Sequence, residues 1–277
     1  AECEPYITAD YRCMMEIPEQ LISGLNIMLS LFPKAKGVIG IEDNKPEAIA
    51  KLTEMCKNES RIEVAVLKTK YPQGGERQLI YAVTGRSINS KMLPADAGCI
   101  VDNVDTVYNV YRAVKFHKPL TERIVTVSGD GISNPCNLEV PFGTSHQRLV
   151  EEAGGMDENT EKILSGGPMM GQAMFTLDVP VIKGSSALLA LKYDEISHSV
   201  MTNCLNCGKC AQVCPEGLIC AKLAQAAAAN DMEGFIKMHG MECIECGTCN
   251  YNCPANRNIT QSVRTMKKKV QAARRKG

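Results

Sequence analysis

The sequence predicts three domains: an α/β domain, a small β-grasp domain of the soluble-ligand-binding type, and an α-helical ferredoxin-type domain with two iron–sulfur clusters. Three observations lead to this prediction. Apolar strands alternate with amphipathic helices at the start of the chain, short strands and turns follow, and eight cysteines then lie in two copies of one pattern. We place the domains at residues 1–120, 121–183 and 184–277.

Length and charge limit the possible functions. The chain of 277 residues is long enough for two or three compact units. Lys plus Arg and Asp plus Glu both number 31, so no overall basic field favours nucleic acid. No apolar run approaches the roughly 20 residues of a membrane-spanning helix. We therefore expect no nucleic-acid partner, and membrane attachment only through other subunits.

The first domain is predicted from alternating periodicities. Apolar residues recur at helical spacing over residues 16–32, with Pro18 in the first turn. A strand at 37–43, a helix at 46–56 and a strand at 61–67 follow, which is the order of an α/β sheet. The opening segment AECEPYITAD lacks a Met and begins within a strand-to-loop transition, so we expect an upstream part of this domain outside the sequence.

Two further segments of this domain suggest a ligand site. Gly74 and Gly75 directly precede a helix at 76–84, where backbone N–H groups can approach a phosphate, although an ordinary turn explains the pair equally well. A strand at 99–103 and a helix at 106–116 follow. They put Asp102 and Asn103 at the carboxyl end of a strand, where α/β sheets bind ligands.

The β-grasp prediction covers short strands around one helix. The expected elements are the strand IVTVSG, the segment GISNPCNLEVPFG, a helix at 145–153, the strand KILSGG and a strand at 179–182. The segment GGPMMG, residues 166–171, has no charged or nucleophilic side chain, so we interpret it as a packing turn. We interpret residues 184–203 as a connection.

The cysteine pattern is that of bacterial two-cluster ferredoxins, C-x2-C-x2-C-x3-C-P, in which the fourth cysteine of each run ligates the other cluster. This rule assigns Cys204, Cys207, Cys210 and Cys253 to one [4Fe-4S] cluster, and Cys243, Cys246, Cys249 and Cys214 to the second. The Ala- and Leu-rich segment between the runs, and residues 259–273, predict helices. The chemistry implied is electron transfer.

Other metal chemistry is less well matched. Zinc sites use pairs of C-x2-C and do not require the third cysteine, the fourth cysteine or the following proline. No signal peptide suggests an oxidising compartment, so we expect no disulfides. We interpret the six remaining cysteines as mostly buried thiols; Cys3 and Cys136 lie in loop-like segments, where a further metal site stays open. A P-loop, a nucleophile elbow and H-E-x-x-H are absent, which gives hydrolysis no support.

Taken in order, several segments resemble the RnfC family, which supplies one subunit of the Rnf electron-transport complex. The shared segments are AECEPY, IEDNKPEAI, LKTKYPQGGERQL, IVDNVDT, SGGPMMG and the two cysteine runs. The resemblance implies an NADH-oxidising electron-input subunit, of the translocase class, that carries FMN and two [4Fe-4S] clusters. It also implies partner subunits, among them an iron–sulfur subunit and membrane subunits, an indirect exchange with ferredoxin, coupling to Na+ or H+ translocation, and a place at the cytoplasmic face of the cell membrane.

The first domain also resembles the flavin subunit of respiratory complex I, which implies a Rossmann-like FMN/NADH domain. The cofactor-binding residues implied by this likeness are Glu2, Glu4, Tyr71, Gly74, Gly75, Glu76, Asp102 and Asn103. Gly75 replaces a glutamate of the family pattern and Asp102 replaces an asparagine, while the Gly-rich loop for the FMN phosphate is absent from this sequence. The domain is therefore expected to be incomplete at its N-terminal side.

Two other functions fit the same motifs. A cobalamin reductase of bacterial microcompartments shares the domain order and both cysteine runs. A non-catalytic iron–sulfur relay or scaffold protein would keep the clusters without the flavin. Iron, sulfide and flavin quantification distinguishes the relay from the oxidoreductase, and corrin reduction would favour the cobalamin enzyme.

Overall fold

The computed structural model describes residues 1–275, and the chain divides into two compact units. The first unit comprises Ala1–Ile88 and Met92–Tyr193. The second comprises Asn89–Lys91 and Asp194–Gly277. The flavin-type and β-grasp sequence features thus fall in the first unit, and the cysteine runs fall in the second.

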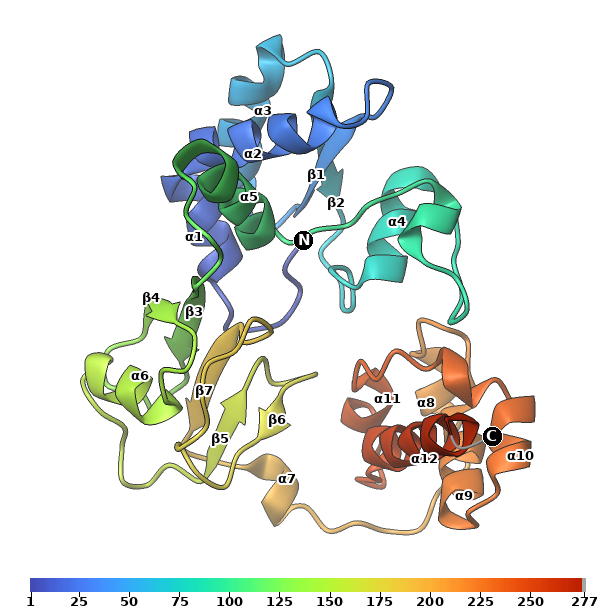
Figure 1. Cartoon of the computed structure of the whole chain (residues 1–277). Helices are drawn as coiled ribbons and strands as arrows, with labels where there is room; N and C mark the ends of the chain where they lie inside the picture. Colours follow the sequence, from blue (N-terminus) through green and yellow to red (C-terminus); the bar gives the residue numbers. More distant parts are fainter. Residues whose placement is uncertain (276–277) are drawn as a thin grey trace. The chain divides into compact units, whose positions relative to one another are not determined.

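The N-terminal part of the first unit surrounds one parallel strand pair with helices (Figure 1). Strand β1 (Gly37–Glu42) pairs with β2 (Ile62–Leu67) from Gly37↔Ile62 to Glu42↔Leu67. The helices are α1 (Ala9–Glu16), α2 (Pro18–Ser30), α3 (Pro46–Met55), α4 (Glu76–Thr84) and α5 (Val104–Phe116), with short 3-10 turns η1 (Cys56–Asn58) and η2 (Pro94–Ala97). Helix α3 joins the two strands and buries Ala48 and Leu52 in the same core as Ile41.

Most of the elements expected here are confirmed, and one is wrong. Proline at the start of α2 and α3 has the backbone angle of a first helical turn, which explains why these starts were predictable. The strand expected at 99–103 is not formed. Cys99 and Val101 pack against Ile80, while β1 and β2 pair only with each other. Asp102 and Asn103 therefore do not follow a strand. Helix α1 was not predicted.

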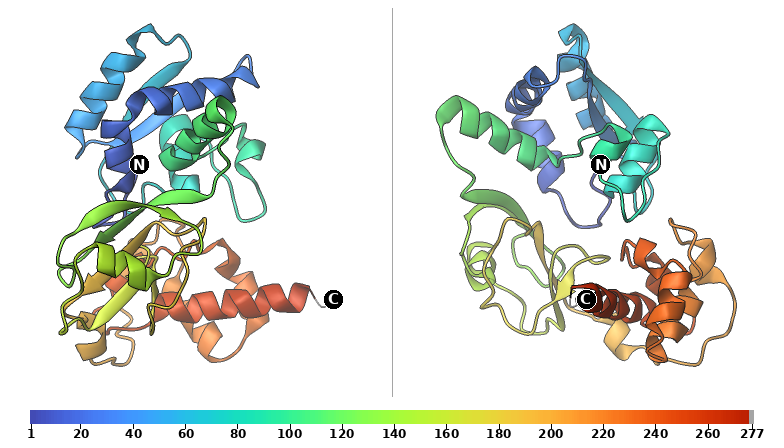
Figure 2. Two further views of the ribbon diagram at one scale, coloured as in Figure 1. Left: turned by 60° about the vertical axis from the view of Figure 1, so that its left-hand side comes forward. Right: turned by 45° about the vertical axis from the view of Figure 1, so that its right-hand side comes forward.

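The second part of this unit is a five-stranded sheet in the order β4-β3-β7-β5-β6. The strands are β3 (Glu122–Ser128), β4 (Cys136–Pro141), β5 (Lys162–Ser165), β6 (Gln172–Ala173) and β7 (Ala187–Leu191). Helix α6 (His146–Glu152) covers one face of the sheet (Figures 1 and 2). Its Leu149 and Val150 share a core with Val125 and Val127 of β3.

Two expectations about this sheet are wrong. Residues 179–182 form only an isolated bridge, between Ser145 and Pro180. The expected connection at 184–203 contains β7, which runs parallel to β3 and antiparallel to β5 in the middle of the sheet. A central strand is buried on both faces, so ALLAL is uniformly apolar and lacks the alternation that identifies a half-exposed strand. The sheet therefore extends to Leu191.

The second unit is helical around a core that includes Leu223, Phe235 and Met266. Its elements are α7 (Glu195–His198), α8 (Lys209–Gln212), α9 (Cys220–Ala228), α10 (Met232–Lys237), η3 (Gly240–Glu242), α11 (Thr248–Tyr251) and α12 (Ile259–Arg274). The expected helices between and after the cysteine runs are confirmed as α9, α10 and α12. None of the helices within residues 1–275 has the length and apolarity that crossing a membrane requires.

Candidate cofactor sites

The two cysteine runs have the same backbone geometry. The residue before the second cysteine of each run is left-handed, with φ of 52° at Asn206 and 60° at Glu245. The glycine after that cysteine is also left-handed, with φ of 77° at Gly208 and 82° at Gly247. Each glycine then caps a one-turn helix, α8 or α11, that carries the third cysteine. Non-glycine residues rarely adopt this conformation, so its repetition marks two equivalent ligand-binding turns.

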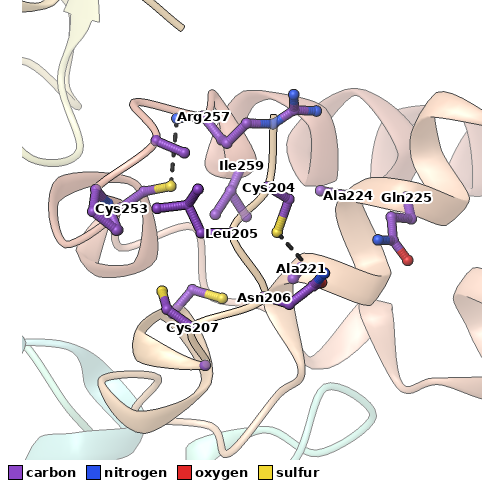
Figure 3. A pocket seen from close by; sticks show the side chains of 14 residues that line it. Cys204, Leu205, Asn206, Cys207, Ala221, Ala224, Gln225, Cys253, Arg257 and Ile259 are labelled. Carbon is purple, nitrogen blue, oxygen red and sulfur yellow. Dashed lines mark hydrogen bonds between the residues drawn. The ribbon is translucent and has the colours of Figure 1, made fainter. Parts of the chain in front are cut away.

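The first pocket is lined by Cys204, Cys207, Cys210 and Cys253, which are the four cysteines assigned to the first cluster. It measures about 60 Å³, and Leu205 and Ile259 add apolar lining. Figure 3 shows the sulfur atoms of Cys204, Cys207 and Cys253 around a common space. Cys204 and Cys207 are exposed, so this pocket lies at the surface of the unit.

The second pocket is lined by Cys214, Cys243, Cys246 and Cys249, the set assigned to the second cluster. It measures about 20 Å³ and is more enclosed, since Cys246 is buried and the other three are half-buried. The buried thiol of Cys220 also lines it and lies within hydrogen-bonding reach of both Cys214 and Cys249. Cys214 belongs to the first run by sequence, yet its sulfur converges with that of the second run.

Several polar groups lie against the cysteine sulfurs. The backbone N–H of Glu245 donates to Cys243 Sγ at 3.4 Å, and that of Arg257 donates to Cys253 Sγ at 3.5 Å. Hydroxyl groups lie 3.2 Å from Cys246 and 3.5 Å from Cys249; they belong to Thr248 and Thr260. Hydrogen bonds to sulfur of this kind are one of the means by which proteins tune iron–sulfur clusters.

Protonation differs among the cysteines of the second pocket. Burial raises the pKa of Cys243 to about 11. Hydrogen bonding from Cys220 lowers the pKa of Cys214 and of Cys249, which favours their thiolates. Iron is ligated by thiolate, so metal binding would displace the proton from Cys243. Within residues 1–275, no three Cys, His, Asp or Glu side chains are grouped as a site for a single metal ion.

A second candidate site lies in the first unit, where the acidic stretch meets the Gly-rich turn. Both Glu4 carboxylate oxygens are hydrogen-bonded, and Tyr71 donates to one of them at 3.4 Å. The Glu2 carboxylate accepts from the backbone N–H of Glu4 at 2.9 Å. Lys45 donates to the backbone oxygen of Glu2 at 3.3 Å and pairs with the buried Glu42 at 3.2 Å. The structure thus brings together three of the predicted residues: Glu2, Glu4 and Tyr71.

Burial dominates the electrostatics of this site. It raises the pKa of Glu2 from 4.5 to about 7, because few partners compensate the desolvated charge. Burial also raises the pKa of the Cys3 thiol, against hydrogen bonds from the backbone of Gly74 and Gln73. Gln73 is buried and its side-chain oxygen accepts no hydrogen bond. Cys3 therefore packs against the Gly-rich turn.

The remaining predicted residues have different surroundings. Gly74 packs against the backbone of Ala1, while Gly75 is the N-cap of α4 and Glu76 is its exposed first residue. Asp102 is exposed. Asn103 caps α5 by accepting from the Asp105 backbone at 2.8 Å, and its amide donates to Asp10 at 2.7 Å. The side chain of Asn103 is thus occupied by contacts within the protein.

Sequence reasoning missed several residues at these sites. Lys45 and Glu42 lie in the segment IEDNKPEAI, but their pairing depends on the turn after β1. Asp10 interacts electrostatically with Glu2 and bonds Asn103, and burial raises its pKa. Cys220 was set aside as a buried thiol. Its position six residues after Cys214, at the start of an apolar helix, was the available signal.

Family models match both parts of the first unit. The model described as the Nuo51 FMN-binding domain matches residues 1–112, and the SLBB domain model matches residues 124–173. These matches agree with the expected α/β flavin-type domain and the β-grasp domain.

Curated relatives extend the likeness to the whole chain. The RnfC-type subunit of the Na(+)-translocating ferredoxin:NAD(+) oxidoreductase complex of Acetobacterium woodii is 43% identical over 277 residues, which is 100% of this chain and 62% of that protein. The chain is homologous to the RnfC family along its whole length. The corresponding protein of the ion-translocating oxidoreductase complex of Rhodobacter capsulatus is 40% identical over 98% of this chain and 52% of its own length. The resemblance to the RnfC family is thereby confirmed.

The chain spans between 47% and 62% of these relatives, the lower figure being for the RnfC-type protein of the proton-translocating ferredoxin:NAD(+) oxidoreductase complex of Clostridium ljungdahlii, which is 42% identical over 78% of this chain. Among solved structures, a chain of the NAD+-reducing [NiFe]-hydrogenase in the air-oxidized state has a TM-score of 0.59 at 18% identity. That match covers 96% of this chain and 45% of the hydrogenase chain, and it shows a shared fold.

Proposed function

We propose that the chain is the NADH-oxidising electron-input part of an ion-translocating ferredoxin:NAD+ oxidoreductase complex, with FMN and two [4Fe-4S] clusters as cofactors. One observation carries the proposal. The eight motif cysteines line two separate pockets, four to each, and the fourth cysteine of each run lies in the pocket of the other. Four thiolates are the complete protein ligand set of a [4Fe-4S] cluster.

The donor sets fit clusters rather than oxygen-liganded metals, because both pockets present sulfur. When bound, the clusters supply one-electron transfer. The protein's own part is to hold the ligands and tune the potential. The N–H groups of Glu245 and Arg257 donate to sulfur, and Lys267 donates to the Cys243 backbone at 2.5 Å and pairs with Glu245 at 3.0 Å. These positive and polar groups favour the more negatively charged, reduced state of a bound cluster.

The acidic stretch and the Gly-rich turn suit a flavin and a nicotinamide nucleotide. When bound, FMN supplies acceptance of a hydride from NADH and release of single electrons. The Gly74–Gly75 turn offers backbone N–H groups at the start of α4, and the unpartnered oxygen of Gln73 is an acceptor in the same turn. We assign the site to Glu2, Glu4, Tyr71, Gly74, Gly75, Glu76, Asp102 and Asn103.

The proposed domain organisation follows from these sites. Residues 1–120 would form the incomplete flavin domain, and the β-grasp domain, with the extension to β7, would end at Leu191. The helical remainder would bind the clusters. The complexes named for the relatives imply partner subunits, including membrane and iron–sulfur subunits, and a peripheral position at the cytoplasmic face of the membrane.

NADH-dependent flavin reduction tests the proposal. The full-length protein, loaded with flavin and clusters under anaerobic conditions, should lose its flavin absorbance on addition of NADH and keep it on addition of NAD+. A fully loaded protein whose flavin absorbance is unchanged by NADH would refute the assignment of electron input.

A further inference from the structure

The hairpin turn between β5 and β6 directs two backbone donors away from its own strands. This turn, residues 166–171, begins with Gly166 at a left-handed φ of 99° and closes with a hydrogen bond from Gly171 N–H to the Gly167 oxygen at 2.9 Å. Gly166 N–H donates to Ala187 of the central strand β7 at 2.7 Å, which ties the turn to the sheet. The turn is thus rigidly presented by the β-grasp domain.

Both donors bind one carboxylate from the acidic stretch. Met169 N–H donates to Glu4 Oε2 at 3.1 Å, and Met170 N–H donates to Glu4 Oε1 at 2.8 Å. Each oxygen of Glu4 therefore takes one backbone donor, a bidentate arrangement with the strength of charge-assisted hydrogen bonds. The contact joins residues that lie 165 and 166 positions apart in the sequence.

The turn also has a shape that only glycine permits. Gly167 is buried, and a β-carbon there would lie 2.5 Å from Cδ and 2.8 Å from Cγ of Glu4. Both distances are far inside van der Waals contact. The absence of a side chain at Gly167 is thus required by the seat of the Glu4 carboxylate rather than by the backbone angle.

Glu4 passes this anchoring on to the candidate nucleotide site. Its backbone N–H donates to the Glu2 carboxylate at 2.9 Å, and Tyr71 of the Gly-rich turn donates to its carboxylate at 3.4 Å. We propose that the 166–171 turn is a latch from the β-grasp domain that sets the position of the acidic stretch, with Glu4 as a positioning residue for NADH. The inference rests on the proposed function, and it gives the segment GGPMMG a role beyond packing.

Deuterium exchange tests the latch without any cofactor turnover. In the full-length protein, Glu4→Ala should speed exchange in peptides that span residues 166–173 about tenfold or more, since two charge-assisted hydrogen bonds are lost. Glu4→Gln should have a smaller effect, because its amide oxygen still accepts one bond. Unchanged exchange in Glu4→Ala would overturn the latch.

Steady-state kinetics then test its consequence. Gly167→Ala should displace the carboxylate and raise the KM for NADH about tenfold with a smaller change in kcat and unchanged iron and flavin content. Gly184→Ala is the matched control, because a methyl group there meets no atom within 4 Å. In a Glu4→Ala background, Gly167→Ala should add little further effect. Additive effects, or no effect of Gly167→Ala, would overturn the positioning role.

The two proposals fail in different ways. If the loaded wild-type protein does not oxidise NADH, the proposed function fails, while exchange at residues 166–173 still decides whether the latch exists. If NADH is oxidised and the exchange and KM values of the variants equal those of the wild type, only the latch fails.

Discussion

Replacing Cys214 by alanine separates an interleaved ligand arrangement from a sequential one. Cys214 belongs to the first run, but it lines the second pocket with Cys243, Cys246 and Cys249. Removing one of four thiolates leaves that cluster without a complete ligand set. The iron content of Cys214→Ala should therefore fall from about eight to about four atoms per chain, measured together with acid-labile sulfide after anaerobic reconstitution.

Paired variants show which cluster is lost. In the interleaved arrangement, Cys214→Ala with Cys243→Ala removes two ligands of the same cluster, so about four iron atoms should remain. Cys214→Ala with Cys204→Ala removes a ligand from each cluster, and the iron content should fall to near zero. A sequential arrangement predicts the opposite pair of results. Observing that opposite pair would refute the ligand assignment and the geometry from which it comes.

A control addresses general damage to the second pocket. Cys220→Ala removes a buried thiol that touches the same pocket but lies outside the ligand set. It should retain about eight iron atoms and change only the potential of the second cluster, through loss of its hydrogen bonds to Cys214 and Cys249. Loss of a cluster in this variant would make Cys220 a ligand.

Three further predictions concern the first unit. Leu188→Ala, at a fully buried position of β7, should lower the free energy of unfolding by about 2–5 kcal/mol in chemical denaturation, whereas Ile182→Ala, at a 60% exposed position, should change it by less than about 0.5 kcal/mol; equal losses would contradict the burial. Burial raises the pKa of Glu2 from 4.5 to about 7, so the folded state holds a proton that the unfolded state releases, and the wild type should lose stability relative to Glu2→Gln as pH rises from 4.5 to about 7; parallel curves of melting temperature against pH would count against this. Hydrogen bonding from Lys192 lowers the pKa of Asp157 from 3.8 to about 2, so the stability it adds is present above pH 3.8 and lost as pH falls towards 2; Lys192→Met should move the acid-unfolding midpoint to higher pH, and an unmoved midpoint would show that the pair adds no stability.

The parts of the fold that were predictable depend on local chemistry. Proline at the first turn of α2 and α3 marks where these helices begin. The cysteine spacing is equally local, since each run makes its own turns at Asn206 and Glu245 before any long-range contact is formed. The pattern of eight cysteines therefore predicted both pocket memberships, although no feature of the spacing reveals that Cys220 joins the second pocket.

The parts that were missed depend on distant partners. A strand needs a neighbour: residues 99–103 have none and stay irregular, while β7 lies between β3 and β5 and is a strand despite its uniform apolar sequence. The contact of Glu4 with the 166–171 turn joins backbone groups, which carry no sequence signature. Asn103 was placed at a strand end and is instead a helix cap, because its side chain satisfies the first turn of α5.

The central claim is that this chain carries two four-thiolate cluster sites together with a flavin domain. One full-length anaerobic preparation, assayed for iron, acid-labile sulfide, zinc and flavin, tests it most directly. We predict about eight iron atoms, about eight sulfides and about one flavin per chain, with no stoichiometric zinc. Two zinc ions without sulfide would contradict the cluster assignment, and about eight iron atoms without flavin would reduce the protein to an electron relay.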